Sequence, residues 1–185
     1  HVFTLSVPSL WRETPAPYCP LFLWIGRGIS SLTGENIVAA VLSHRVIVLA
    51  GVGLIVWATP RLARRCGVAE VTALWLGAAN PLLLMHLVAG IHNEALMLGL
   101  MLTGTEIALR GIASPHPQVS RAAPAHVVSG AVLITLSSQV KLPGLLALGF
   151  VAMAVAQRWG GTVRAFLKAG LLMGSVALVV TAAIG

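Results

Sequence analysis

The sequence predicts an all-α protein, a polytopic bundle of transmembrane helices, and three observations support this fold class. Hydrophobic residues make up 57% of the 185 residues, charged residues make up 9%, and the mean hydropathy is +0.92. Soluble domains are typically about 45–50% apolar and about 25% charged. The apolar residues also gather in runs that approach the ~20 residues needed to cross a bilayer.

The N-terminal part, residues 1–36, is expected to belong to an extracytoplasmic loop, and residues 37–185 are expected to form one membrane domain. The chain begins at His1 without an initiator Met and ends inside an apolar run at Gly185. We therefore expect an internal fragment of a larger protein, truncated at both ends. Within the loop, residues 21–32 are too few to span a bilayer, and their aromatic residues beside Arg27 suit a short interfacial helix.

About six spans are expected, with two breaks. The Asn80-Pro81 pair is predicted to break the second span, because proline removes a backbone donor and disfavours helical geometry at the preceding residue. Pro143, two residues after Lys141, is predicted to bend the chain where the fourth and fifth spans meet. Pro60 is predicted to end the first span. The predicted spans are residues 37–58, 71–88, 93–109, 125–140, 142–157 and 169–184, with a loop at 111–124.

The basic residues predict the orientation of these spans. If the spans alternate, the loops after the first, third and fifth spans lie on one side, and by the positive-inside rule that side is the cytoplasm. These loops hold Arg61, Arg64, Arg65, Arg110, Arg121, Arg158, Arg164 and Lys168. The net charge of +7 is then a matter of topology. The cations share no single face and no stacking aromatics, so no nucleic-acid partner is expected.

The most informative stretch is residues 74–97, which sets six polar or helix-breaking residues in apolar sequence. Polar groups in lipid are costly and usually have a function. These residues are Asn80, Pro81, His86, His92, Asn93 and Glu94. A structural alternative also applies, because Asn93 can cap the third span and Glu94 favours its positive N-terminal end. The spacing of His92 and Glu94 lacks the i, i+4 pattern of helical metal ligands, and no metal is expected.

Two cations join this group. Arg45, about a third of the way into the first span, must snorkel, pair with an acid such as Glu35 or Glu94, or face a polar cavity. Lys141 has the same alternatives. Cations and imidazoles at one membrane face suit an anionic lipid headgroup, because ammonium and guanidinium groups bind phosphate strongly.

A further acid and cation, Glu106 and Arg110, are four residues apart near the cytoplasmic end of the third span. On a helix this spacing makes them neighbours of opposite charge. An i, i+4 pair of structural importance is therefore their expected role.

Three strings resemble a known family: TPAPYCPLFLW, LWLGAANPLLLMHLVAGIHNEALMLGLML and VKLP. Together, over most of the chain, they look like the actinobacterial polyprenol-phosphate-mannose-dependent α-1,6-mannopyranosyltransferases of the GT-C class. The resemblance implies a GT-C-like membrane enzyme that takes mannose from polyprenyl-phosphate-mannose at the outer face of the plasma membrane. It would extend the α-1,6-mannan core of lipomannan and lipoarabinomannan during cell-envelope biosynthesis. It implies no cofactor, and its partners would be the donor, a lipid-linked mannan acceptor and membrane lipid.

The resemblance also assigns residues. Substrate and donor-phosphate binding falls to Arg45, His86, His92, Asn93, Glu94 and Lys141, the loop near the site to Pro17, Tyr18 and Pro20, and the structural break to Asn80 and Pro81. Cys19 stands where the family pattern has Gly. Because Gly tolerates backbone angles that Cys does not, the loop of this chain is expected to differ in conformation from the family pattern if that Gly needs such angles.

The catalytic residue itself is unknown. GT-C enzymes use an acid, usually Asp, of the first large external loop as base, and this chain contains no Asp. Glu13 or Glu94 could serve chemically, but we expect the base upstream of His1. The mechanism implied is inversion at the mannose anomeric carbon.

Two alternatives from other classes stay open. Broken helices and intramembrane polar residues also mark the midplane substrate sites of transporters and lipid flippases. Against a transporter, the sequence shows no convincing internal repeat, and its polar clusters fall at the outer ends of the spans. A non-catalytic membrane subunit that binds lipid or a partner enzyme is the third possibility.

Overall fold

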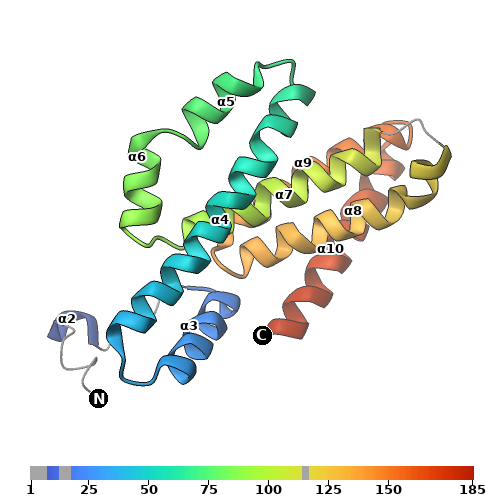
Figure 1. Ribbon diagram of the computed structural model, residues 1–185. Helices are drawn as coiled ribbons and strands as arrows, with labels where there is room; N and C mark the ends of the chain where they lie inside the picture. The colour runs from blue at the N-terminus through green and yellow to red at the C-terminus, as the bar shows by residue number, and fades with distance from the viewer. Residues whose placement is uncertain (1–7, 13–17, 114–116) are drawn as a thin grey trace.

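A computed structural model describes residues 8–12, 18–113 and 117–185, and this part of the chain is helical without a strand. Figure 1 shows the arrangement. The elements are α2 (Ser9–Arg12), α3 (Pro20–Thr33), α4 (Ile37–Arg65), α5 (Glu70–Gly77), α6 (Pro81–Leu84), the π-helix η1 (Met85–Ala89), α7 (Glu94–Ala113), α8 (Pro117–Ser138), the 3-10 helix η2 (Leu142–Leu145), α9 (Leu146–Arg158) and α10 (Val163–Ile184). The all-helical class is confirmed.

Among the described residues, three helices are long and apolar enough to cross a membrane: α4 with 29 residues, α7 with 20 and α10 with 22. The pair formed by α5 and Pro81–Ala89 is bent by 45° and would make a fourth span. The apolar part of α8, Pro124–Ser138, and the segment Leu142–Arg158 are shorter. The expected count of about six spans is therefore not confirmed by helix length and composition.

Several predicted helix ends were wrong. α4 continues through Pro60 to Arg65. Beyond the proline, the last turns are held by hydrogen bonds, from Arg61 to the carbonyl of Trp57 and from Arg65 to a carboxylate of α7. The predicted loop at 111–124 is also shorter, because α7 runs to Ala113 and α8 starts at Pro117. Proline is well suited to the first turn of a helix, where its missing N–H has no partner to lose.

Helix α7 lies at the centre of the bundle and packs closely on both neighbours through small residues. A Cβ added to Gly51 of α4 would lie 2.5 Å from the carbonyl carbon of Ala95, and one added to Gly99 would lie 2.5 Å from the carbonyl oxygen of Gly51. Gly104 of α7 and Gly130 of α8 meet in the same way. Small residues at such crossings let backbones approach in membranes, where dispersion replaces the hydrophobic effect between helices.

The contacts divide the bundle into two ends. α4 and α7 run parallel, since Gly51 lies beside Ala95 and Arg65 reaches α7 further along. The site end, as we call it, comprises residues 18–24, 86–94, 139–141 and 181–184. Its parts are joined by hydrogen bonds from Leu21 N to Gln139 O (3.0 Å) and from Trp24 Nε1 to Ile184 O (3.2 Å). The opposite, basic end comprises residues 61–70, 106–113 and 158–168.

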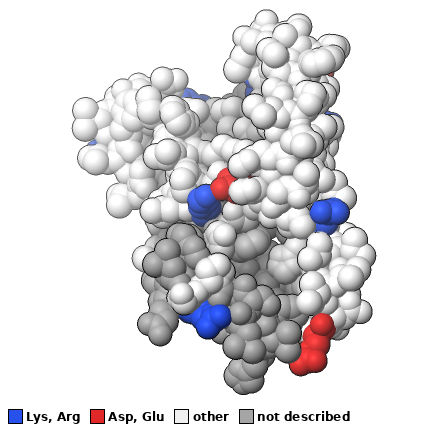
Figure 2. Space-filling model, turned by 90° about the vertical axis from the view of Figure 1, so that its left-hand side faces the viewer, with Lys and Arg blue, Asp and Glu red and all other residues white. Residues whose placement is uncertain are grey.

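The apolar residues form two buried clusters, one among α7, α8, α9 and α10 and one among α4, η1 and α7. The outward faces of α4 and α10 carry exposed aliphatic residues such as Val46, Leu171 and Leu178. On the face shown in Figure 2, the described surface carries few charged side chains. Exposed apolar faces of this kind are expected of helices that contact lipid or further helices.

Candidate functional site

The predicted break at Asn80-Pro81 is confirmed. α5 ends at Gly77, and Asn80 takes an extended backbone conformation (φ −64°, ψ 122°). Its side-chain oxygen accepts a hydrogen bond of 2.9 Å from the N–H of Leu82, so Asn80 caps α6. Pro81 is the first residue of α6, where its missing N–H costs least. The break turns the next segment by 45° and sets η1 against α4.

The segment after the break has an irregular backbone that places two histidines together. Met85–Ala89 is a π-helix, a form found often at functional sites. Ile91 has φ +53°, a left-handed conformation that is uncommon for a β-branched residue. Gly90 has no room for a side chain, since an added Cβ would lie 2.5 Å from the carbonyl oxygen of His86 and 2.6 Å from Cδ2 of His92. The turn is thus fitted closely against the His86 carbonyl and the His92 imidazole.

These constraints assemble what we call the Glu94 cluster: His86, His92, Glu94 and Lys141. The imidazole rings of His86 and His92 stack with centroids 4.1 Å apart and an angle of 20° between their planes. His92 Nδ1 lies 3.5 Å from Glu94 Oε2, and Lys141 Nζ donates to Glu94 Oε1 at 2.5 Å. The side chains of His92, Glu94 and Lys141 are partly exposed. The sequence placed these residues at one end but did not predict their pairing.

Lys141 reaches the cluster because the chain breaks between α8 and η2, as predicted. α8 ends at Ser138, and Lys141 is extended (φ −157°, ψ 131°) before the first turn of η2. Gln139 holds this junction from two sides: its carbonyl accepts from Leu21 N of α3, and its Nε2 donates to Thr181 Oγ1 of α10 at 3.1 Å. The sequence predicted a break here but not its link to α10.

The loop residues near the site are only partly described. Tyr18 packs the edge of its ring on Phe22 at 5.3 Å between centroids, and Pro20 starts α3. Cys19 has φ −81°, a value open to any residue, so Cys in place of Gly requires no left-handed backbone here. Pro17 and Glu13 lie outside the described residues.

Arg45 faces a groove. It lines an open apolar groove of about 660 Å³ between α4 and the segment Pro81–Ala89. The other lining residues are Leu49, Val52, Pro81, Leu84, Met85, Val88 and Ala89. The two acids proposed as partners, Glu35 and Glu94, form no ion pair with Arg45, and its Nε is buried without a hydrogen-bond partner in the described chain. The sequence alternatives included a polar cavity, but the groove that Arg45 lines is mainly apolar.

Asn93 does not cap α7 with its side chain. Its backbone carbonyl accepts from the N–H groups of Leu96 and Met97, which begins the helix. The side chain is buried, with 5% of the residue exposed, and Nδ2 lacks a hydrogen-bond partner within the described ranges. Glu94 is the first residue of α7, where its negative charge interacts favourably with the positive end of the helix dipole, as predicted. The cap interpretation was therefore wrong for Asn93 and correct for the position of Glu94.

At the basic end, Glu106 has a partner that the sequence did not reveal. Arg65 of α4 binds it through two hydrogen bonds, of 2.6 Å and 2.9 Å, while Arg110 is 3.4 Å away. The predicted i, i+4 pair exists but is the weaker contact. The side chain of Glu106 is 3% exposed. This carboxylate is buried, fully paired and remote from any groove with a free cation, so it is best explained as a structural link between α4 and α7.

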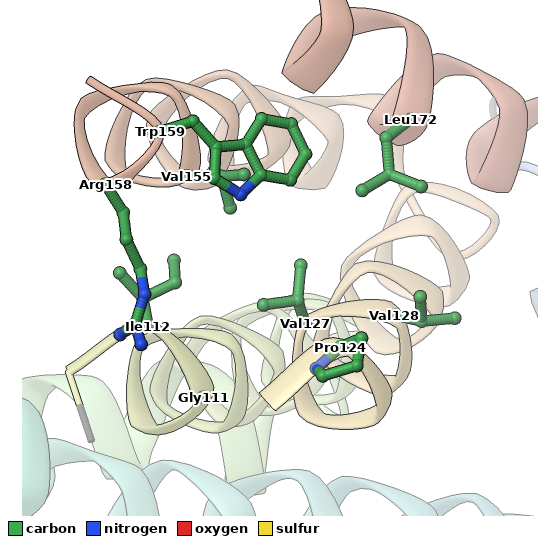
Figure 3. Close-up of a pocket in the computed structure, with 9 residues that line it drawn as sticks. All are labelled: Gly111, Ile112, Pro124, Val127, Val128, Val155, Arg158, Trp159 and Leu172. Atoms are coloured by element: carbon green, nitrogen blue, oxygen red, sulfur yellow. The ribbon is translucent and has the colours of Figure 1, made fainter. Parts of the chain in front are cut away.

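The basic end also has a pocket of about 220 Å³, shown in Figure 3. Arg158, the last residue of α9, and the following Trp159 face Ile112 of α7 and Val127 of α8 across the pocket, and Leu172 of α10 lies beside Trp159. Among the described residues that line it, none carries a carboxylate, imidazole or thiol. The pocket therefore lacks groups for acid–base or nucleophilic chemistry. The described residues also bring no three His, Cys, Asp or Glu side chains together as a metal site would require.

Comparison with known proteins agrees with this geometry. Residues 1–157 match the family model described as alpha-(1->6)-mannopyranosyltransferase, N-terminal domain. The chain is 70% identical to a probable alpha-(1->6)-mannopyranosyltransferase of Mycolicibacterium smegmatis and 63% identical to an alpha-(1->6)-mannopyranosyltransferase of Mycobacterium tuberculosis, over 100% of this chain in both cases. It is 43% identical to alpha-(1->6)-mannopyranosyltransferase B of Corynebacterium glutamicum over 82% of its length.

The chain spans only part of these relatives, 36%, 38% and 25% of their respective lengths. No solved structure matches it significantly. The family match nonetheless covers most of the chain, including the Asn80-Pro81 break, the Glu94 cluster and Arg45. The chain therefore belongs to the alpha-(1->6)-mannopyranosyltransferase family.

Proposed function

We propose that this chain forms part of the membrane domain of a mannosyltransferase that uses polyprenyl-phosphate-mannose as donor. The acceptor is a growing α-1,6-mannan, the core of lipomannan and lipoarabinomannan, at the outer face of the plasma membrane. One observation carries the proposal: Arg45, a cation without an acidic partner among the described residues, stands at a large apolar groove beside the site end. That combination suits a ligand with a lipid chain and a phosphate.

The orientation is supported by charge. The basic end carries Arg61, Arg64, Arg65, Arg110, Arg158, Arg164 and Lys168. Basic residues concentrate on the cytoplasmic side of membrane proteins, which puts the site end on the extracytoplasmic side. Donor and acceptor would then meet outside, with the polyprenyl chain between helices and the sugars in water.

The proposed reaction is inversion at the anomeric carbon. An acceptor hydroxyl loses its proton to a carboxylate of the external loop and attacks C1 of the donor mannose. The new oxygen–carbon bond forms as the bond from C1 to the phosphate oxygen breaks, and polyprenyl phosphate departs with that electron pair. Because phosphate is already a good leaving group, the protein's tasks are to position it and to neutralise its charge.

The residues of the site divide by position. Arg45 contacts the phosphate, while His86, His92, Asn93, Glu94 and Lys141 surround the remainder of the substrates. Tyr18 and Pro20, with Pro17 before them, belong to the loop near the site. Asn80 and Pro81 act indirectly by turning η1 toward Arg45.

The test is transfer activity of the full-length protein in membranes supplied with polyprenyl-phosphate-mannose. Arg45→Gln should lower turnover by about tenfold or more, the loss expected for one charge-assisted contact in a transition state. Arg45→Lys should retain part of the activity. Arg64→Gln is the matched control, because Arg64 is an exposed arginine of the same helix at the other end, paired with Glu70.

Membrane insertion of each variant should match the wild type, which reports on folding separately from chemistry. Unchanged turnover in Arg45→Gln would refute the role of Arg45. A flippase or transporter would instead move the donor across a sealed bilayer without transferring mannose. The gathering of polar groups at one end of the bundle favours the transferase, since transporters hold theirs at the midplane.

A further inference from the structure

Lys141 is paired with the Glu94 carboxylate, whereas Arg45 has no acidic partner among the described residues. Lys141 is neutralised by Glu94 through a 2.5 Å contact, and His92 lies on the other oxygen of the same carboxylate. A phosphate brought to Lys141 would therefore also meet the Glu94 carboxylate. Two like charges a few ångströms apart repel, and the repulsion is strong where water is partly excluded. Within the Glu94 cluster, the charges of Glu94 and Lys141 cancel, so this pair has no net charge to offer an anion.

A hydroxyl group suits the cluster better than a phosphate does. A carboxylate accepts hydrogen bonds and an ammonium donates them, whereas a sugar hydroxyl does both. Glu94 Oε2 has no hydrogen-bond partner in the described chain, and neither has the buried Nδ2 of neighbouring Asn93. Unpaired buried polar atoms are costly, and a bound polyol is a means of satisfying them. The stacked rings of His86 and His92 add a flat surface for the C–H face of a sugar.

The short helix η1 contributes residues to both the groove and the cluster. Met85, Val88 and Ala89 of this π-helix line the Arg45 groove, and His86 of the same helix forms the stack. On α4, Arg45 is the groove residue nearest the site end, since Leu49 and Val52 follow it toward the basic end. The apolar groove, the lone cation and the polar cluster thus lie around the same short helix. A ligand built of a lipid chain, a phosphate and a sugar carries one chemical group for each.

We infer that the Glu94 cluster is a recognition site for the uncharged hydroxyls of the mannosyl unit, and that Arg45, not Lys141, is the phosphate anchor. Lys141 and Glu94 act as one hydrogen-bonding unit, in which each fixes the other. This division rests on the proposed function and specifies which part of the donor each group contacts.

Binding of the phosphate and binding of the mannose can be measured separately with two probes, polyprenyl phosphate and polyprenyl-phosphate-mannose. Each probe is titrated against full-length protein in nanodiscs. In the wild type the mannosylated probe should bind more tightly. Glu94→Gln and Lys141→Met should each reduce that advantage by about tenfold, as expected for a lost hydrogen bond to a charged group. Arg45→Gln should weaken both probes by the same factor, because both carry the phosphate.

The sign of one effect is the sharpest test. Glu94→Gln removes the acid that neutralises Lys141, so it should leave the affinity for polyprenyl phosphate unchanged or raise it, while affinity for the mannosylated probe falls. Lys141→Met leaves the Glu94 carboxylate without its cation, so it should lower the affinity for polyprenyl phosphate only slightly and that for the mannosylated probe much more. If Lys141→Met weakens polyprenyl phosphate as much as it weakens the mannosylated probe, Lys141 is a phosphate ligand and the inference is wrong, although the proposed function stands.

Misfolding and failure of the proposed function give other results. A misfolded variant would lose both its thermal transition and its binding of both probes. The double variant Glu94→Gln with Lys141→Met then provides a second test, because it removes the ion pair without leaving a lone charge. That double variant should bind polyprenyl phosphate like the wild type and lose the mannose increment; loss of both probes from a folded double variant would overturn the inference. Wild-type protein that binds neither probe would overturn the proposed function itself.

Discussion

The two ends of the bundle each hold a glutamate of α7 against a cation from another part of the chain, but only one of the two carboxylates is fully paired. At the basic end, Glu106 is almost fully buried and accepts two hydrogen bonds from Arg65, with Arg110 close by. At the site end, Glu94 is partly exposed and is held by Lys141 through one oxygen only. The first carboxylate is saturated, whereas the second keeps an unpaired oxygen beside an imidazole.

The backbone around the two carboxylates also differs, being regular at the basic end and irregular at the site end. Arg65 and Glu106 lie on regular helices that cross closely at Gly51 and Gly99. Glu94 follows a π-helix and a residue in the left-handed region, and Lys141 lies in a break between helices. Regular, saturated contacts give stability, while irregular backbone persists only where its surroundings hold it in place and is found most often at binding and catalytic sites. The comparison predicts that variants at the two ends will fail in different assays.

The largest expected effect is at the basic end. Arg65→Met should lower the unfolding free energy of the full-length protein by about 3 kcal/mol, because it leaves Glu106 buried with only its weaker partner. Unfolding of the detergent-solubilised protein, followed by near-UV circular dichroism, measures this free energy. Arg64→Met is the matched control: its pair with Glu70 is exposed, so the change should stay within about 0.5 kcal/mol.

Arg65→Met with Glu106→Leu should recover part of the loss, since no buried charge is then left unpaired. Equal destabilisation by Arg65→Met and Arg64→Met would show that the burial of Glu106 does not matter, and would remove the distinction between the ends.

The next effect is at the site end and concerns activity. Gly90→Ala should lower mannose transfer by about ten- to a hundredfold, since a Cβ there displaces His86 or His92 and small misplacements in a site cost that much. Gly149→Ala, in α9 with nothing within 4 Å of the added Cβ, should leave transfer unchanged. Both variants should insert equally into membranes. Full activity of Gly90→Ala would mean that the histidine stack has no part in function.

Local rules explain what the sequence predicted well. Both helix breaks lie where expected, because proline acts on its own turn and on the residue before it. The polar residues of the predicted site lie at one end because helices that cross the membrane in alternating directions leave few possible arrangements of the chain. The same local rule failed at Pro60, where the contacts of Arg61 and Arg65 carry α4 past the proline. The count of six spans depended on α8 and α9, whose apolar parts are shorter than a span.

The pairings within the ends were beyond the sequence for a different reason. Lys141 and Glu94 are 47 residues apart, and Arg65 and Glu106 are 41 apart. Each acid had several cations at the same membrane depth, and which one it meets depends on helix rotation and crossing. The stack of His86 on His92 depends on a π-helix and on the left-handed Ile91, neither of which has a sequence signature. Gly90 between the two histidines was the one available signal.

The smallest expected effect concerns how the site end is held in place. Gln139 links the junction before Lys141 to Thr181 of α10 by one partly buried hydrogen bond. Gln139→Leu should lower the unfolding free energy by about 1 kcal/mol, the usual net value of one such bond. Transfer should nonetheless fall several-fold, because Lys141 loses a restraint on its position. Thermal unfolding and turnover in membranes measure the two effects.

A double-mutant cycle completes this test. Thr181→Val breaks the same bond, so Gln139→Leu and Thr181→Val together should lower transfer no more than either alone, since contacting partners are not additive. Additive losses would mean that Gln139 acts through some other contact. At the basic end the corresponding loss of a partner should reduce stability and leave the turnover of the remaining folded protein unchanged. The contrast between the ends therefore depends on whether a broken contact changes the fraction of folded protein or the activity of each folded molecule.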